Sequence, residues 1–518
     1  MKKLYSLLSL FLVASNMALF AQSGKLDNSF GTGGTSNTIV GSGGQIWAMS
    51  SIDGWSVVVG GLGKIGNDTD FTLMKFTQDG TADATFGSNG IVTTQVGGHG
   101  SAIVYATMLQ NDGKVIAAGK AWNGTSYDFA IVRYTIAGIV DSTFGTNGKI
   151  ITHLGTGNNV VNGLCTQDGW SVVVGGIVQS SNNTDFVVMR YTRDGIIDST
   201  FGANGIVTTD FGTGNNDVLS ALAVQSDSSI IAVGTSSSGS VNSFALARYT
   251  KTGALDNTFG TGGMVIVSGS GDDEATSISL RSDGKMIVGG YISNGVNDDF
   301  GLMRFKTTGE IDNSFGNNGK VITPVGNGDD GIYALVTQTD GKIIGTGSSL
   351  INGIYRTAMV RYNATGSLDT TFGVGGKVIG TDTSGNSEIY AATLQNDGKV
   401  LVAGYSNNGT TDQLSLSRYS TTISVGLIDF ATSDNQFIVY PNPVAQNATL
   451  EYALNKDENV TIKLIDMEGR MIETIADNQL QVAGKHKQAV VMPDVLAPGS
   501  YLLVISSASG KMSIKIVK

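Results

Sequence analysis

The chain has 518 residues, and its charged residues make up only 14% of it against a hydrophobic fraction of 41%, which excludes a largely disordered protein. The formal net charge of −11 has the wrong sign for a phosphate backbone, so we expect no nucleic-acid partner. The single cysteine, Cys165, cannot form an intrachain disulfide, and we interpret it as a small buried hydrophobe.

The first 21 residues have the features of a secretory signal peptide. Lys2 and Lys3 precede an apolar run that is short for a membrane span, and a small residue, Ala21, stands just before Gln22. We therefore expect cleavage between Ala21 and Gln22, export of the protein, and no transmembrane span in the mature chain.

A motif built on Phe-Gly recurs along most of the sequence. Its seven copies are separated by 56, 58, 57, 58, 56 and 57 residues and lie at Phe30, Phe86, Phe144, Phe201, Phe259, Phe315 and Phe372. Such a period indicates one structural unit repeated seven times, in place of several separate domains. We assign the repeats to residues 22–420, a polar linker to 421–436 and a different unit to 437–518.

Each repeat has the pattern of four short strands. In the copy that begins at Phe86, runs of β-branched residues predict strands at 90–96, 103–109, 115–118 and 129–134. The pair Asp112-Gly113 favours a tight turn between the second and third strands. We expect strand 90–96 to open a blade, which would place the Phe-Gly motif at the joint between the outer strand of one blade and the inner strand of the next.

Four antiparallel strands repeated seven times can bury both faces of every sheet if the sheets stack around an axis. The sequence thus predicts an all-β fold, a seven-bladed β-propeller of four-stranded blades. A linear solenoid is the alternative, but it would need distinct capping repeats, and the first and last copies resemble the middle ones.

A basic residue near the end of the last strand of each repeat and an acid in each Phe-Gly motif recur with the same period. Because a charge between packed sheets needs a partner, we expect each base to meet one acid. The bases are Lys75, Arg133, Arg190, Arg248, Arg304, Arg361 and Arg418, and the acids are Asp27, Asp83, Asp141, Asp198, Asp256, Asp312 and Asp369. Sevenfold recurrence favours a structural role, since an active site is single.

Residues that could carry chemistry are few. His99, His153 and His486 lack a paired metal-binding spacing, and no Gly-x-Ser-x-Gly motif stands out, so we assign no catalytic residue and no cofactor. Acid clusters in the loops leave calcium as an alternative to a solvated acidic rim: Asp272-Asp273-Glu274, Asp298-Asp299 and Asp329-Asp330. We expect partner contacts in the variable loops, at 97–100, 155–159, 212–217, 269–274 and 326–330, and in the central channel.

The repeat resembles the delta-60 repeat, a β-propeller domain of unknown function found in bacterial secreted proteins. The matching signature is Gln-x-Asp-Gly-Lys, as at 110–114, followed by Arg-Tyr and then Leu-Asp-x-Ser/Thr-Phe-Gly-x-x-Gly, over roughly residues 24–420. The resemblance implies a propeller and brings no catalytic residues. The copies depart from the signature at Asp227-Ser228-Ser229 and at Tyr355-Arg356-Thr357, which replaces the usual Asp-Phe.

Short alternating strands after residue 437 predict a small immunoglobulin-like β-sandwich. This unit resembles the type A C-terminal sorting domain of the type IX secretion system of Bacteroidetes, with matches at Tyr440, Pro441, Asn442, Pro443, Gly469, Pro498, Gly499 and Tyr501. The resemblance implies recognition by the outer-membrane secretion machinery and a secreted or surface-attached protein. A plain adhesive sandwich is the alternative.

We therefore expect a non-catalytic binding or structural module for an extracellular protein or glycan. The alternative is a secreted carbohydrate-active enzyme, a hydrolase or lyase, that uses acidic residues in the channel.

Overall fold

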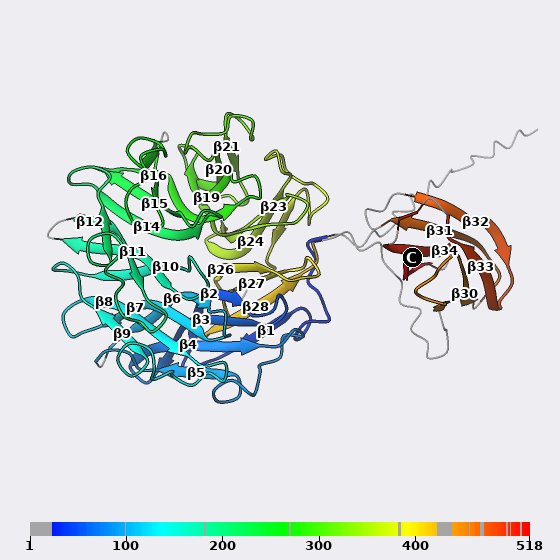
Figure 1. Cartoon of the computed structure of the whole chain (residues 1–518), viewed down its shortest axis with the longest axis horizontal. Helices are drawn as coiled ribbons and strands as arrows, with labels where there is room; N and C mark the ends of the chain where they lie inside the picture. Colours follow the sequence, from blue (N-terminus) through cyan, green and yellow to red (C-terminus); the bar gives the residue numbers. More distant parts are fainter. Residues whose placement is uncertain are drawn as a thin grey trace, which may run out of the picture. The chain divides into compact units, whose positions relative to one another are not determined.

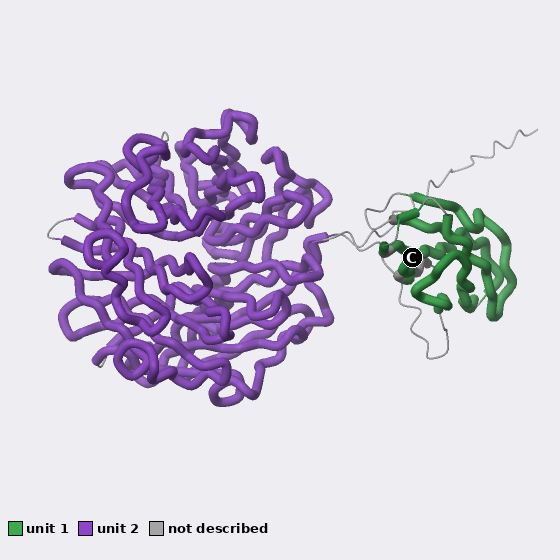
Figure 2. The backbone as a smooth tube through the Cα atoms, viewed as in Figure 1, with its two compact units in different colours: residues 1–22, 423–518 green, residues 23–422 purple. Residues whose placement is uncertain are grey.

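The computed structural model describes residues 23–98, 100–180, 183–268, 271–381, 385–421, 438–454, 456–466, 471–493, 496–497, 499–507 and 510–518. The chain divides into two compact units, one of residues 23–422 and one that contains residues 423–518 (Figure 2). The expected signal peptide, with its cleavage point at Ala21 and Gln22, and most of the expected linker lie outside the described residues. No helix among the described residues is long and apolar enough to cross a membrane.

The first unit is a ring of seven antiparallel four-stranded sheets, so the predicted seven-bladed propeller is confirmed (Figure 1). The first blade comprises β2 (Gly44–Ser51), β3 (Val57–Ile65), β4 (Asp68–Phe76) and β5 (Ile91–Thr94). The second comprises β6 (Ala102–Leu109), β7 (Val115–Trp122), β8 (Tyr127–Tyr134) and β9 (Lys149–Thr152). The third comprises β10 (Asn159–Cys165), β11 (Val172–Ser180), β12 (Asn183–Tyr191) and β13 (Ile206–Thr209).

The remaining blades continue in the same order around the ring (Figure 1). The fourth comprises β14 (Asn216–Val224), β15 (Ile230–Ser238), β16 (Val241–Tyr249) and β17 (Met264–Ser268). The fifth comprises β18 (Glu274–Leu280), β19 (Met286–Ser293), β20 (Asp298–Phe305) and β21 (Lys320–Thr323). The sixth comprises β22 (Asp330–Thr337), β23 (Ile343–Ile351), β24 (Ile354–Tyr362) and β25 (Lys377–Ile379).

The seventh blade closes the ring with strands from both ends of the repeat region. It comprises β26 (Ser387–Leu394), β27 (Val400–Asn407), β28 (Asp412–Tyr419) and β1 (Thr35–Thr38). β1 pairs antiparallel with β28, with Thr35 opposite Ser417. β26 also contacts β2, so the innermost strands form a closed circle. Closure covers the edges that a linear solenoid would have to cap.

The expectation that residues 90–96 open a blade is wrong. β5 pairs with β4 as the fourth strand of the first blade, with Phe71 opposite Thr94, and the second blade begins at β6. The Phe-Gly motif therefore lies within a blade, between its third and fourth strands. The period of a repeat does not show which strand comes first in the sheet, because that depends on pairing between strands.

Apolar side chains fill the spaces between adjacent blades. At the junction of the first and second blades, for example, Phe71 and Leu73 pack against Val104, Val115 and Tyr134. These side chains are fully or almost fully buried. Burial of both faces of each sheet thus follows from the ring.

The C-terminal unit has two antiparallel sheets around one apolar core that includes Leu450, Ile462, Leu464, Val490 and Leu503. One sheet comprises β29 (Ile438–Tyr440), β30 (Asn447–Leu454) and β33 (Gly484–Val491). The other comprises β32 (Met471–Gln481), β31 (Glu458–Asp466), β34 (Ser500–Ser507) and β35 (Gly510–Val517).

Candidate binding site

The structure brings together all seven pairs of bases and acids singled out in the repeats. The side-chain nitrogen and the Asp Oδ2 are 2.8 or 2.9 Å apart in Lys75–Asp83, Arg133–Asp141, Arg190–Asp198, Arg248–Asp256, Arg304–Asp312, Arg361–Asp369 and Arg418–Asp27. Each arginine also lies over the Phe ring of its motif, as Arg133 does at 4.7 Å from the centroid of Phe144. Arg133 further donates to the backbone carbonyl of Arg193 in the next blade. The motif thus holds a blade to its neighbour.

Function has to be sought where the seven copies differ, and the first difference lies next to the axis of the ring. A β-bulge in each innermost strand releases one residue from the ladder and re-aims its side chain. The bulged residues are Trp47, Tyr105, Asn162, Ser220, Thr276, Tyr333 and Tyr390. The four aromatic ones belong to four consecutive blades, the sixth, seventh, first and second.

These aromatic rings touch one another across the blade junctions. Trp47 stacks on Tyr390 with centroids 4.1 Å apart, and Trp47 and Tyr105 meet edge to face at 5.7 Å. Tyr333 meets Tyr390 edge to face at 5.0 Å. All four side chains are only partly buried. One half of the inner wall is therefore aromatic, and the other half carries small polar side chains.

The second difference is a cavity of about 230 Å³ between the sixth and seventh blades. It arises from two substitutions in the sixth blade. Thr357 stands where five other blades have Phe71, Phe129, Phe186, Phe244 and Phe300. Gly380, next to it on the outer strand, stands where other blades have Thr94, Thr152, Thr209 and Thr323. Both residues line the cavity, together with hydroxyl-bearing side chains of the seventh blade.

Tyr419 lacks the threonine partner that the equivalent tyrosines have at other blade junctions. In four other junctions the equivalent tyrosine hydroxyl bonds a threonine hydroxyl of the preceding blade, in the pairs Tyr134–Thr94, Tyr191–Thr152, Tyr249–Thr209 and Tyr362–Thr323. At this junction Gly380 takes the place of the threonine, and Tyr419 lines the cavity instead. Burial raises the pKa of Tyr419 to about 12, so its hydroxyl stays protonated.

Glu388 connects the cavity with the aromatic half of the inner wall. Its Oε1 accepts a hydrogen bond of 2.9 Å from Tyr405, and its Oε2 accepts from Tyr333 at 3.3 Å and Ser348 at 3.2 Å. Burial and the charge of Glu388 raise the pKa of Tyr333 to about 12, and the same two causes raise the pKa of Tyr405. Both phenols therefore remain donors. Glu388 is the one carboxylic acid among the described residues that line the cavity.

The loop acids mostly serve the backbone. Asp273 accepts from the Ser293 amide and pairs with Lys320, and Asp330 accepts from the Val325 and Gly326 amides. These contacts satisfy one oxygen of Asp330, whose Oδ1 is buried without a partner among the described groups.

The histidines and the cysteine hold structural positions where they are described. His153 Nδ1 lies 2.6 Å from Asp128 Oδ1, and His486 stacks on Tyr452 at 5.1 Å. Burial raises the pKa of Cys165 to about 12, which makes it a poor nucleophile. His99 lies outside the described residues.

The residues of the expected sorting motif secure the end of the chain within the second unit. Asn442 Oδ1 accepts from the Val517 amide at 2.9 Å, and Gly499 and Lys518 exchange two backbone hydrogen bonds. Tyr501 donates to the Ala497 carbonyl at 2.6 Å, and Tyr440 donates to Glu451. Pro441 and Pro443 both follow cis peptide bonds. Gly469 and Pro498 lie outside the described residues.

Of this site, sequence reasoning missed Glu388, Tyr405 and the aromatic bulge positions. The departure at Tyr355-Arg356-Thr357 was visible in the sequence and was interpreted only as local variation. It is the signal that could have located the cavity, since it removes an aromatic side chain from a repeated position.

Two family descriptions match the sequence. "Domain of unknown function (DUF5122) beta-propeller" matches residues 53–86, 110–144, 166–201, 225–259, 281–315, 338–372 and 395–422. "Secretion system C-terminal sorting domain" matches residues 438–518. No curated protein matches the chain.

Several solved structures are similar at low identity. The polysaccharide lyase Uly1 is 10% identical, with a TM-score of 0.45, over 78% of this chain and 97% of the lyase. A protein of unknown function from Dyadobacter fermentans is 10% identical, with a TM-score of 0.43, over 75% of this chain and 100% of that one. Sqt1 from Chaetomium thermophilum, bound to the N-terminus of ribosomal protein L10, is 10% identical, with a TM-score of 0.40, over 74% and 98%.

Proposed function

Because the chain belongs to the DUF5122 beta-propeller family and ends in a secretion system C-terminal sorting domain, we propose that it is a non-catalytic glycan-binding protein of the cell exterior. The sorting domain makes it a secreted or cell-surface protein that interacts with the type IX secretion machinery. The propeller is then the part that acts outside the cell.

The observation that carries the proposal is the unequal distribution of aromatic residues around the inner wall. Trp47 and Tyr390 occupy bulge positions that Ser220 and Thr276 fill in other blades of the same fold. Folding therefore does not require aromatic rings there. Ligand sites combine aromatic surfaces with a few placed polar groups, and Glu388 supplies such a group beside the rings.

The cavity between the sixth and seventh blades suits a sugar unit better than an apolar ligand. Its wall carries hydroxyl groups of Thr35, Thr357, Ser387 and Ser415 besides the carboxylate of Glu388. Hydroxyl groups of a sugar can donate to that carboxylate and accept from those side chains. A hydrolase of the usual two-carboxylate type would need a second acid, and the described lining contains Glu388 alone.

The experiment is retention of the mature protein by a panel of immobilised or gel-embedded polysaccharides. We expect one class to retain the protein, and Trp47→Ala to weaken retention at least about ten-fold, as loss of an aromatic contact with a ligand does. Ser220→Ala, at the same position of the fourth blade, is the matched control and should bind normally. Release of shortened chains would favour the enzyme alternative, and a folded protein that no polysaccharide retains would refute glycan binding.

A further inference from the structure

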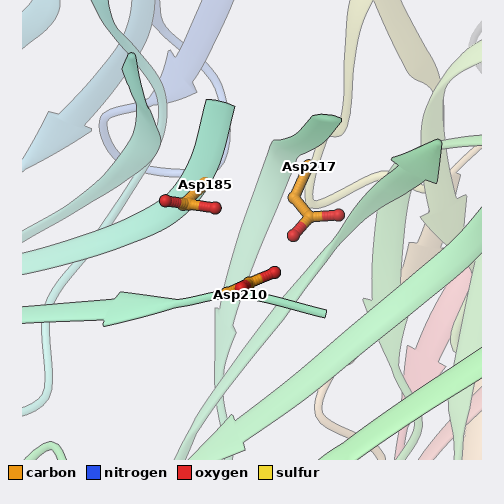
Figure 3. Close-up of side chains that lie close together, drawn as sticks. All are labelled: Asp185, Asp210 and Asp217. Carbon is orange, nitrogen blue, oxygen red and sulfur yellow. The ribbon is translucent and has the colours of Figure 1, made fainter. Parts of the chain in front are cut away.

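Three carboxylates converge at the junction of the third and fourth blades (Figure 3). Asp185 lies on β12, Asp210 follows β13, and Asp217 lies on β14. One oxygen from each side chain lies within 4.8 Å of the others. It is the one such group of acids, histidines or cysteines found among the described residues.

Asp217 is the buried member of the group. Its exposed fraction is 0%, its Oδ2 accepts a hydrogen bond of 2.8 Å from the Phe211 amide, and its Oδ1 is buried without a partner among the described groups. A buried carboxylate oxygen without a donor or a cation is costly. Figure 3 shows the Asp217 side chain directed toward Asp210 and Asp185. The buried acid therefore faces two more negative charges.

The pKa shifts of Asp217 and Asp185 are consistent with three carboxylates whose negative charge is not compensated. Burial, the largest cause, raises the pKa of Asp217 and outweighs the lowering by the Phe211 amide and the nearby Ser236 hydroxyl, and the charge of Asp210 adds to the rise. Burial likewise raises the pKa of Asp185, with further contributions from Asp210 and Asp217. Both shifts mean that the ionised carboxylates are disfavoured in the protein as it stands.

The preceding junction shows how the same positions are filled when the charge is balanced. There Asp128 occupies the place of Asp185, His153 that of Asp210, and Asn159 that of Asp217. Asp128 meets His153 at 2.6 Å and also accepts from Asn123 at 2.9 Å. The propeller thus does not need three acids at these positions to fold.

We propose that Asp185, Asp210 and Asp217 bind a calcium ion that joins the third and fourth blades. Carboxylate oxygens are ligands for hard cations, and calcium at 2.3–2.6 Å from each ligand, as is usual, accommodates oxygens up to about 5 Å apart. Magnesium, at about 2.0–2.1 Å, requires a tighter octahedral set. A calcium ion cancels two of the three charges and gives Asp217 Oδ1 a partner.

The ion would stabilise the contact between the two blades, to an extent that depends on the calcium concentration outside the cell. It would connect strands of two blades with the chain between Asp210 and Asp217. Extracellular calcium modules bind at about 10⁻⁴–10⁻³ M, so we expect an affinity in this range. This site is distant in sequence from the sixth-blade cavity, and its test does not depend on glycan binding.

The test combines calorimetric titration of the mature chain with calcium and thermal melting in about 5 mM calcium or in chelator. We expect one ion per chain and a rise in the melting temperature of about 2–4 °C with calcium. Asp217→Asn should abolish the titration signal and the rise, and in chelator it should melt at or above the wild type, because a like charge is removed. Asp194→Asn, an exposed acid of the third blade that follows the other end of β12, is the control of equal charge change and should respond like the wild type.

Three results would overturn the proposal. One is a wild-type chain that shows no heat of binding and no shift in melting with calcium. A second is an Asp217→Asn variant that binds calcium as tightly as the wild type. The third is a wild type that is stabilised by mild acid but not by calcium, which would mean that the buried carboxyl holds a proton in place of an ion.

Discussion

Arg418 Nε lies 2.8 Å from Asp27 Oδ2, although 391 positions separate the two residues in the chain. In the other six pairs the acid follows the base by eight residues, as Asp141 follows Arg133. Arg418 also donates to the backbone carbonyl of Gln78 in the first blade. The same contact that organises one repeat elsewhere thus joins the two ends of the propeller.

Removal of Arg418 should destabilise the propeller more than removal of Lys75, the least buried base of the seven pairs. Arg418→Ala removes a buried guanidinium with its hydrogen bonds and leaves Asp27 with its second base, Lys399, 2.9 Å away, so we expect the free energy of unfolding to fall by about 2 kcal/mol. Lys75→Ala is the control, because the Lys75 and Asp83 side chains are 19% and 17% exposed, and should cost about 1 kcal/mol or less. Urea unfolding measures both, and equal losses would contradict a special role for the closing pair.

Filling the cavity between the sixth and seventh blades should stabilise the protein and abolish ligand binding. The double variant Thr357→Phe, Gly380→Thr restores the residues of the other blades, and we expect a gain of about 1–2 kcal/mol. The two changes belong together, because a Cβ at Gly380 would lie 2.3 Å from Thr357 Oγ1. Melting and polysaccharide retention measure the outcome. A stable double variant that still binds would place the glycan elsewhere.

The buried tyrosine hydroxyls should differ in their contribution according to their partners. Tyr134→Phe leaves the buried Thr94 hydroxyl without its hydrogen bond of 2.9 Å, and we expect a loss of about 1–2 kcal/mol. Tyr419→Phe removes the hydroxyl of a residue that lines the cavity, and its effect should stay within about 0.5 kcal/mol. Urea unfolding compares the two, and a larger loss for Tyr419 would show that its hydroxyl has a structural partner.

Acid should destabilise the propeller as the repeated acids are protonated. The hydrogen bonds from Lys75 and Thr85 lower the pKa of Asp83 to about 2. Burial raises the pKa of Asp27, but the hydrogen bonds from Ser29 and Lys399 outweigh it and lower the value to about 2. The unfolded value is about 3.9, so this stability is complete above about pH 4 and is lost as the pH falls toward 2.

The urea midpoint between pH 7 and pH 2 tests this dependence. Asp83→Asn should show a shallower decline than the wild type, since one of the titrating groups is gone. Asp185 and Asp217 have raised pKa values, so their protonation favours the folded state and opposes the decline. A midpoint that stays constant down to pH 2 would contradict the prediction.

Much of the fold was present in local patterns. The Phe-Gly period indicated seven blades. The recurrence of one base and one acid with that period indicated the ion pairs. The candidate site had no such signature. Neither Thr357 nor Gly380 belongs to a recognisable motif. The cavity becomes visible only when these two residues lie beside Glu388 and Tyr419 at a blade junction.

By itself, the sequence determined the number of repeats, the strands within each and the residue types that join them, since these depend on contacts between near neighbours in the chain. The tertiary structure alone decided which strand opens a blade, that β1 completes the seventh sheet, and that Asp185, Asp210 and Asp217 converge. The physical reason is that these features depend on contacts between different strands, and the residue pattern of one strand does not show which other strand it pairs with or packs against.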